Sequence, residues 1–224
     1  GHVTTRGRVE RDGTLRTVVG SLGGAIAKLD LGADLLGPGA HSEIRGFCFA
    51  DGRQHLDHHT CHRHASGKTT SNIDFRQALS GKARAAYTGL IRIEEGAGGA
   101  EAQQENRNLL LSGDSRVDTI PELEILTDDV SCSHGATVAP LDLEPLFYLQ
   151  SRSISPEEAV RLIVRGFIDE TLEGAPASAL VGLEEGLSRR LEALDPDQVL
   201  ASAAEVSGAA GPASATKLRP GAAQ

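Results

Sequence analysis

The 224-residue chain contains no methionine and no tryptophan, and aromatic residues make up only 3% of it. A hydrophobic core therefore has to be built from Leu, Val, Ile and Ala, which the 39% hydrophobic content allows. Position 1 is not a methionine, and the opening stretch "GHVTTRGRVE" already has the pattern of a strand and a turn. We expect that the N-terminal part of a longer protein is missing.

Cysteine is also scarce: Cys48, Cys61 and Cys132 are odd in number and show no CxxC spacing, which is not typical of a secreted disulfide framework and favours a cytoplasmic location. No apolar run reaches the roughly 18 residues of a membrane span, and no signal peptide is visible. No dense Lys/Arg cluster accompanies the net charge of -9, so we expect no nucleic-acid partner and interpret the charge as a soluble surface.

Glycine, by contrast, is abundant at 26 residues, which indicates many tight turns. Up to about residue 126, short segments of patchy alternation such as "RTVVG", "SEIRGFCF" and "GKARAAYTGLIRI" are separated by Gly, Asp and Asn. No long amphipathic helix interrupts them. Strands that follow one another in this way predict a barrel, a sandwich or a β-solenoid, and the pattern alone does not choose among the three.

The pattern then becomes helical. "SISPEEAVRLIVRGFIDETLE" predicts a helix in which Ser155 caps the N-terminus, Pro156 is the first residue and Glu158 completes a capping box. A second helix is expected over residues 179–194. We therefore divide the chain into a β core (1–145), a helical domain (146–202) and a Pro/Gly-rich tail (203–224) that we expect to be disordered.

The segment "QHLDHHTCHRHASGKTTSN" contains five histidines and a cysteine within ten residues. In a regular strand His58, His62 and His64 would share one face, and His59 and Cys61 the other. The first three are candidate metal ligands, although neither a standard zinc spacing nor an HExxH motif is present. The alternative is a polar strand whose histidines bond to neighbouring turns.

A second cluster is "DDVSCSHGATV", in which Cys132 and His134 are two residues apart and would face the same way on a strand. A thiolate and an imidazole can together bind iron, copper or zinc. They could instead be a nucleophile and its base, or a buried cysteine beside a hydrogen-bonded histidine. Two ligands are too few for a closed metal site, so a metal would need ligands from elsewhere, including another chain.

The stretch "NRNLLLSGDSRVDTIPELEILTDDVSCSHGATVAPLDLEPLFYLQSRSISPEEAVRLIVRGFIDETLE" resembles the core of the SufB/SufD family, the scaffold subunits of the SUF iron–sulfur cluster assembly system. The resemblance extends upstream through "DHHTCHRHASGKTTSN" and covers roughly residues 30–173. Ser133-His134-Gly135 stands where SufB-type chains typically carry Glu-His-Glu, so the chain is more similar to the SufD type. Ala139 and Ser153 replace glycines that are common in the family.

The resemblance implies a right-handed parallel β-helix followed by a small α-helical domain. It also implies a SufB-type partner that pairs through the β-helices, and a SufC ATPase that docks on the C-terminal helices. We expect the polar side of the first helix, with Glu158, Arg161 and Arg165, to face that ATPase.

By the same resemblance, His134 matches the SufD histidine at the subunit interface, where a transient iron–sulfur cluster is thought to form with a SufB cysteine. Cys132 matches the neighbouring family cysteine. The expected function is thus a non-enzymatic scaffold without a resident cofactor. The alternatives are a metal-dependent enzyme that uses the histidines of residues 55–64, and a purely structural β-solenoid.

Overall fold

The computed structural model describes residues 1–209, which form ten strands followed by four α-helices and one short 3-10 helix. The strands are β1 His2–Val9, β2 Thr14–Ser21, β3 Ile26–Leu35, β4 His41–Ala50, β5 His55–His64, β6 Thr70–Leu79, β7 Arg84–Ile93, β8 Ala100–Leu110, β9 Arg116–Ile125 and β10 Val130–Pro140. The helices are α1 Leu143–Ser151, α2 Pro156–Asp169, η1 Glu170–Leu172, α3 Ala177–Glu192 and α4 Pro196–Ala209.

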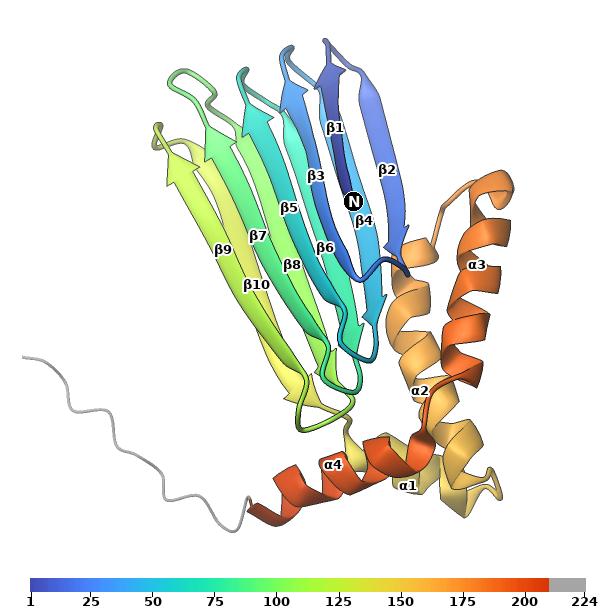
Figure 1. Cartoon of the computed structure of the whole chain (residues 1–224). Coiled ribbons are helices and arrows are strands. Elements are labelled where there is room, and N and C mark those ends of the chain that lie inside the picture. Colours follow the sequence, from blue (N-terminus) through green and yellow to red (C-terminus); the bar gives the residue numbers. More distant parts are fainter. Residues whose placement is uncertain (210–224) are drawn as a thin grey trace, which may run out of the picture.

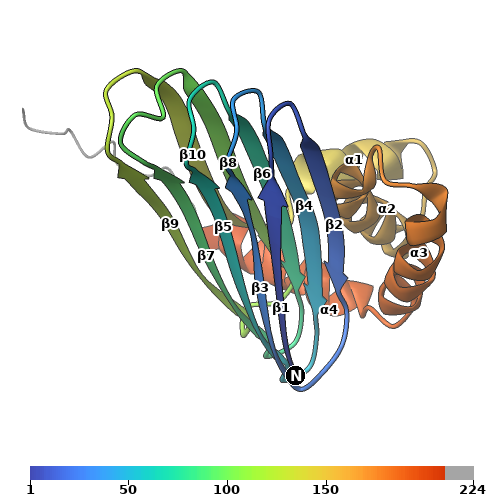
Figure 2. The same ribbon diagram turned by 90° about the horizontal axis from the view of Figure 1, so that it is seen from above.

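The strands wind into a β-solenoid of five coils (Figure 1). Each coil gives one strand to sheet A, in the order β1-β3-β5-β7-β9, and one to sheet B, in the order β2-β4-β6-β8-β10. All pairs within each sheet are parallel. Figure 2 shows the two sheets facing each other, with the helices on the outer side of sheet B. The predicted fold class, a parallel β-helix followed by helices, is therefore confirmed.

Equivalent residues of successive coils stack in register, so that Ile44 of β4 lies beside Ile73 of β6 in the interior. The turns repeat as well. Gly52 and Gly81 occupy the same place in consecutive turns, with φ of 58° and 65°. A Cβ atom on Gly81 would lie 3.0 Å from the backbone nitrogen of Gly52, so the coils approach too closely there for a side chain. The short segments with Gly punctuation in the sequence are thus single strands of a stacked coil.

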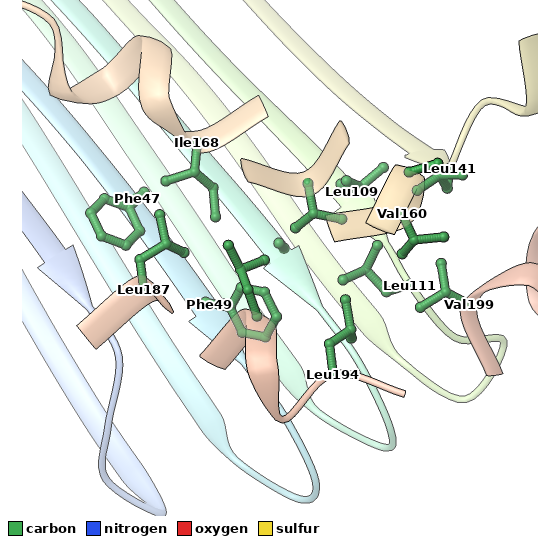
Figure 3. Close-up of a cluster of buried hydrophobic side chains, with 14 of the residues drawn as sticks. Phe47, Phe49, Leu109, Leu111, Leu141, Val160, Ile168, Leu187, Leu194 and Val199 are labelled. Atoms are coloured by element: carbon green, nitrogen blue, oxygen red, sulfur yellow. The ribbon is translucent and has the colours of Figure 1, made fainter. Parts of the chain in front are cut away.

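The helices pack on the half of sheet B that carries outward-facing apolar side chains. Phe47 and Phe49 of β4 point out of the solenoid and contact a buried cluster that includes Val160, Ile168 and Leu187 (Figure 3). Full burial of one such side chain stabilises the fold by roughly 1.5–3 kcal/mol. These apolar contacts of α2 and α3 with β4 hold the helical domain on the solenoid.

Helix α2 begins as predicted, because Pro156 is its first residue and the Ser155 hydroxyl accepts a hydrogen bond from the Glu158 backbone amide (3.2 Å). The second predicted helix is α3, two residues earlier than expected. Helices α1 and α4 were not predicted. Helix α4 runs to Ala209, so the expectation of disorder was wrong for residues 203–209, where Ala203 packs against the apolar cluster. The rest of the expected tail lies outside the described residues.

One arginine joins the solenoid to the helices. Arg76 of β6 is only 3% exposed, and its guanidinium donates to the Phe167 carbonyl (2.8 Å) and to the Glu170 carboxylate (2.5 Å). The same group pairs with Asp74 at 3.3 Å and lies 5.6 Å from the centre of the Phe167 ring. Arg76 therefore satisfies the C-terminal end of α2 while it packs in the interface.

The Arg76→Leu variant is expected to unfold at a lower urea concentration, with a loss of about 2–3 kcal/mol, because a charged donor to a partly buried carbonyl is removed. The control is Arg116→Leu, which breaks only the exposed Arg116–Asp118 pair and should leave the urea midpoint unchanged. Equal midpoints for the two variants would contradict the role given to Arg76.

Ser153, in the turn between α1 and α2, has a φ of 65°. This left-handed conformation is strained for a residue with a Cβ atom. The Ser153→Gly variant is therefore expected to raise the free energy of unfolding by about 1 kcal/mol in thermal or urea denaturation. In contrast, Ser188→Gly in the middle of α3 should lower it by about 0.5 kcal/mol. A loss of stability in both variants would rule out strain at Ser153.

In residues 1–209, none of the helices combines the length and the apolarity that crossing a membrane requires.

Candidate functional site at the open end of the solenoid

The last coil, formed by β9 and β10, lies at one end of the stack, and no further coil of residues 1–209 covers it. These two strands are the outermost members of sheets A and B, and no other strand of residues 1–209 pairs with their outer edges. Large apolar side chains are exposed on this coil and just after it, including Ile120, Ile125 and Val138. Free strand edges beside exposed apolar side chains are typical of a surface that pairs with another chain.

Cys132 and His134 lie on β10, on the side that continues the solenoid interior. Cys132 pairs in register with Ala102, and His134 with Gln104, and both of these β8 residues are buried. In an inner coil the two positions would be covered by the next strand. On the last coil His134 is exposed and Cys132 is half-buried against the cluster around Ile91. The two candidate ligands therefore face the open end, where another molecule can reach them.

The three cysteines differ in how easily each could become a thiolate. Burial raises the pKa of the Cys132 thiol, and a backbone hydrogen bond from Ala102 partly opposes this rise. Cys48 is completely buried in the interior, which raises its pKa to about 12. Cys61 is half-buried on the outer face of sheet A. Cys132 is thus the cysteine at the open end, and its thiol is protonated at neutral pH.

The interior next to His134 is lined by amides that the sequence reading missed. Gln104 is buried, and its Nε2 donates to the Gly89 carbonyl (3.2 Å), whereas its Oε1 has no hydrogen-bond partner within residues 1–209. Asn106 Oδ1 accepts from Thr119 Oγ1 (2.8 Å) and from Asn108 Nδ2 (2.7 Å). The sequence contains a pattern that could have predicted this lining. In "QQENRN", the amide side chains of Gln104, Asn106 and Asn108 recur at every second position of one strand and therefore share one face.

The histidine-rich segment is a regular strand, β5, and its faces are those predicted. His58, His62 and His64 point into the solenoid and are buried, whereas His59 and Cys61 lie on the outer face. Each buried ring bonds to different hydroxyl groups: Ser21 for His58 (2.9 Å), Ser42 for His62 (2.9 Å), and Thr69 and Ser71 for His64 (2.8 Å each). The alternative interpretation, a polar strand whose histidines bond to neighbouring turns, is thus correct only in part, because Ser21, Ser42 and Ser71 lie on strands β2, β4 and β6, whereas Thr69 lies in the turn before β6.

Burial lowers the pKa of His58 to about 4, of His62 to about 3 and of His64 to about 4, so all three rings are neutral at pH 7. No group of three or more His, Cys, Asp or Glu side chains within residues 1–209 is arranged to hold a metal ion. The prediction of a metal site formed by His58, His62 and His64 was therefore wrong. Strand geometry is the reason, since alternate residues of a strand are spread along its length instead of converging.

The three residues expected on the polar side of α2 have different surroundings. Glu158 is exposed in the first turn. Arg161 donates from Nε to the Leu191 carbonyl (3.2 Å) and so ties α2 to α3. Arg165 pairs with Asp169 (3.2 Å) and borders a groove of about 570 Å³. The remaining residues of this α2–α3 groove are Val181, Glu184, Glu185, Ser188 and Arg189.

Residues 2–167 match the family described as "SUF system FeS cluster assembly, SufBD core domain". The chain belongs to the SufBD family. The matched SufBD region contains the whole solenoid and extends through most of α2, so it includes Cys132 and His134. Members of this family take part in iron–sulfur cluster assembly.

Mycobacterial members of the SufBD family are similar to the chain. It is 36% identical to "Iron-sulfur cluster assembly SufBD family protein ML0594" of Mycobacterium leprae over 72% of this chain and 43% of that protein. Identity to the family protein Rv1462 of Mycobacterium tuberculosis is also 36%, over 74% of this chain and 44% of the relative. ML0593 of Mycobacterium leprae is 32% identical over 85% of this chain and 22% of its own length. The chain thus spans less than half the length of these relatives.

Proposed function

We propose that this SufBD-family chain acts as a SufD-type, non-enzymatic scaffold that builds an iron–sulfur cluster together with a SufB-type subunit and a SufC-type ATPase. The observation that carries the proposal is the position of Cys132 and His134 on the last coil, reachable from the open end of the solenoid. A SufD-type assignment is supported by Gly135, since the SufB-type pattern has a glutamate there.

The partner subunit supplies what this site lacks. A thiolate and an imidazole supply two protein ligands, whereas an iron–sulfur cluster is commonly held by four. The free edges of β9 and β10 lie directly beside the two ligands. A second solenoid that pairs with these edges covers the exposed apolar side chains and brings its own ligands next to His134. The shared ligand set also allows a finished cluster to leave when the two chains separate.

The chemistry of the two side chains suits a site that fills only when iron arrives. His134 binds a metal ion through a neutral ring nitrogen, and Cys132 does so as a thiolate. Because burial raises the pKa of Cys132, the thiol is protonated and poorly nucleophilic before loading. Metal binding then releases its proton. The iron–sulfur cluster is the cargo of this site, and the protein contributes ligands and a protected surface.

The helical domain offers a second surface, for the ATPase. Phe147 of α1 is 74% exposed, and Tyr148, Leu162 and Val181 are exposed as well. Arg165 lies in the α2–α3 groove next to Val181. An ATPase that binds these side chains can shift the helices when its own conformation changes. Because Arg76 connects α2 to β6, such a shift is coupled to sheet B, which contains β10.

Co-expression of the chain with a SufB-type subunit and a SufC-type ATPase tests the proposal. We expect the three proteins to copurify, and iron and sulfide to be retained by the complex but not by this chain alone. Replacing Thr137 with proline, which introduces a residue without an amide hydrogen into β10, should reduce copurification with the SufB-type subunit. The matched control is Thr4→Pro in β1, at the opposite end of the solenoid. Cluster retention by the chain alone would overturn the idea of a shared ligand set.

A further inference from the structure

We propose that the stacked turns beside β5 and β7 form a binding site for a phosphate-type oxyanion. A cavity of about 270 Å³ lies there, and its lining residues are Arg53, Gln54, His55, Lys82 and Arg84. Every ionisable side chain of this lining is basic, in a chain whose net charge is -9. The site is formed by the fold, because the two arginines and the lysine come from two different coils.

The cavity has a rigid frame. The turn after β4 and the turn after β6 lie side by side at the end of the solenoid drawn lowest in Figure 1. Lys82 donates its backbone amide to the Gly52 carbonyl (2.7 Å), and Arg84 donates to the Gln54 carbonyl (2.8 Å). The Gln54 side chain accepts from the Asp51 amide (3.0 Å) and donates to the Gly24 carbonyl (2.8 Å). These bonds fix the backbone from which the basic side chains extend.

Two of the cavity's three permanent charges, those of Arg53 and Arg84, have no carboxylate partner within residues 1–209, whereas Lys82 pairs with Asp114 (3.5 Å). His55 and Arg84 are register partners in neighbouring strands, and Arg116 continues the same row, so basic side chains lie directly opposite one another. Such like-charge pairs destabilise a sheet. Within residues 1–209, neither Arg53 nor Arg84 forms an ion pair. The nearby carboxylates have other partners: Asp51 pairs with Arg190, Asp57 with Lys28 and His59, Asp114 with Lys82, and Asp118 with Arg116.

Another row on the same outer face of sheet A provides the contrast. There Arg63 and Arg92 are register partners, yet Asp34, Glu94 and Glu124 lie between and beside them. Arg92 pairs with Glu94 (3.0 Å) and Glu124 (2.9 Å). The sheet thus neutralises Arg63 and Arg92 with its own carboxylates and leaves Arg84 of the other row open to an external anion. Arginine side chains favour oxyanions that accept several hydrogen bonds at once, which is the chemistry of a phosphoryl group.

Inorganic phosphate is the probe for this site. The imidazole of His55 is followed by NMR while phosphate replaces chloride at constant ionic strength. We expect saturable chemical-shift changes of His55 and of the backbone amides of residues 52–55 and 82–84. Arg84→Gln should weaken phosphate binding at least about fivefold, since a charge-assisted hydrogen bond is lost.

The matched control is Arg92→Gln, which removes an arginine from the same face of the same strand but outside the cavity. It should leave phosphate affinity within a factor of about two, because Arg92 is already paired with carboxylates. Non-saturating shifts would overturn the proposal. An equal loss of affinity in Arg84→Gln and Arg92→Gln would do the same, because it would reduce the effect to overall charge. The readout involves neither iron nor a partner chain, so it is independent of the scaffold function proposed above.

Discussion

Acidification from pH 7 to pH 5 is expected to remove about 6 kcal/mol from the free energy of unfolding, a large part of the stability of a typical domain. The cause is the row of buried histidines on β5. His58, His62 and His64 have pKa values of about 4, 3 and 4 in the folded chain because burial disfavours their charged forms. In the unfolded chain each ring titrates near the ordinary value of about 6.5.

These pKa values determine the direction in which the free energy of unfolding changes with pH. Between about pH 6.5 and pH 4 the unfolded chain binds up to three more protons than the folded chain, so acid favours unfolding. The stabilisation is complete above about pH 6.5 and is lost as the pH falls toward the folded pKa values. At pH 5 each histidine contributes a loss of about 2 kcal/mol relative to pH 7. Carboxylates that are ion-paired in the folded chain lose their contribution mostly below this range.

Urea unfolding at pH 7, 6 and 5 measures the effect, and the slope of stability against pH is the readout. His62→Gln, whose amide can still bond to Ser42, should reduce that slope by about one third, whatever it does to stability at pH 7. The control is His134→Gln, which removes an exposed ring on the last coil, outside the basic cavity. An unchanged slope in His62→Gln would show that the buried ring is not the source of acid sensitivity.

Much of this fold could be predicted from the sequence because its signals are local. Ser155 and Pro156 mark the start of α2 by capping chemistry, and alternation predicted which histidines of β5 share a face. The choice of a solenoid over a barrel or sandwich came from the family resemblance, since strand pairing between coils leaves no local pattern. Helix α4 was missed because its composition is small and polar, whereas its order comes from the contact of Val199 and Ala203 with the rest of the apolar cluster.

The candidate site was predictable only in part. The spacing of Cys132 and His134 predicted a common face, but their exposure depends on β10 being the last strand of sheet B, which is a property of the whole stack. The density of His58, His62 and His64 pointed to metal, although distance along a strand separates them. The basic cavity left no run of Lys and Arg in the sequence. Arg53 and Arg84 are brought together by the coil repeat of about thirty residues.

Replacing His134 with alanine is expected to lower the amount of iron–sulfur cluster assembled with a SufB-type subunit and a SufC-type ATPase by at least about tenfold. Loss of a group that only supports a metal ligand already costs about 10- to 100-fold, and His134 is proposed to be a ligand itself. The fold should be spared, because the ring is exposed on the last coil and makes no hydrogen bond within residues 1–209. Iron and sulfide content after reconstitution is the measurement, with a thermal melt to confirm folding.

Two further variants separate a ligand from a merely structural side chain. His134→Cys should recover a substantial part of the assembled cluster, since thiolates are the commonest ligands of such clusters, whereas His134→Gln keeps much of the size and polarity but should remain as deficient as the alanine variant. His59→Ala, on the outer face of sheet A, is the control for loss of an accessible histidine and should assemble a normal amount. Full assembly by His134→Gln would show that His134 serves packing at the interface and that iron is held by other groups.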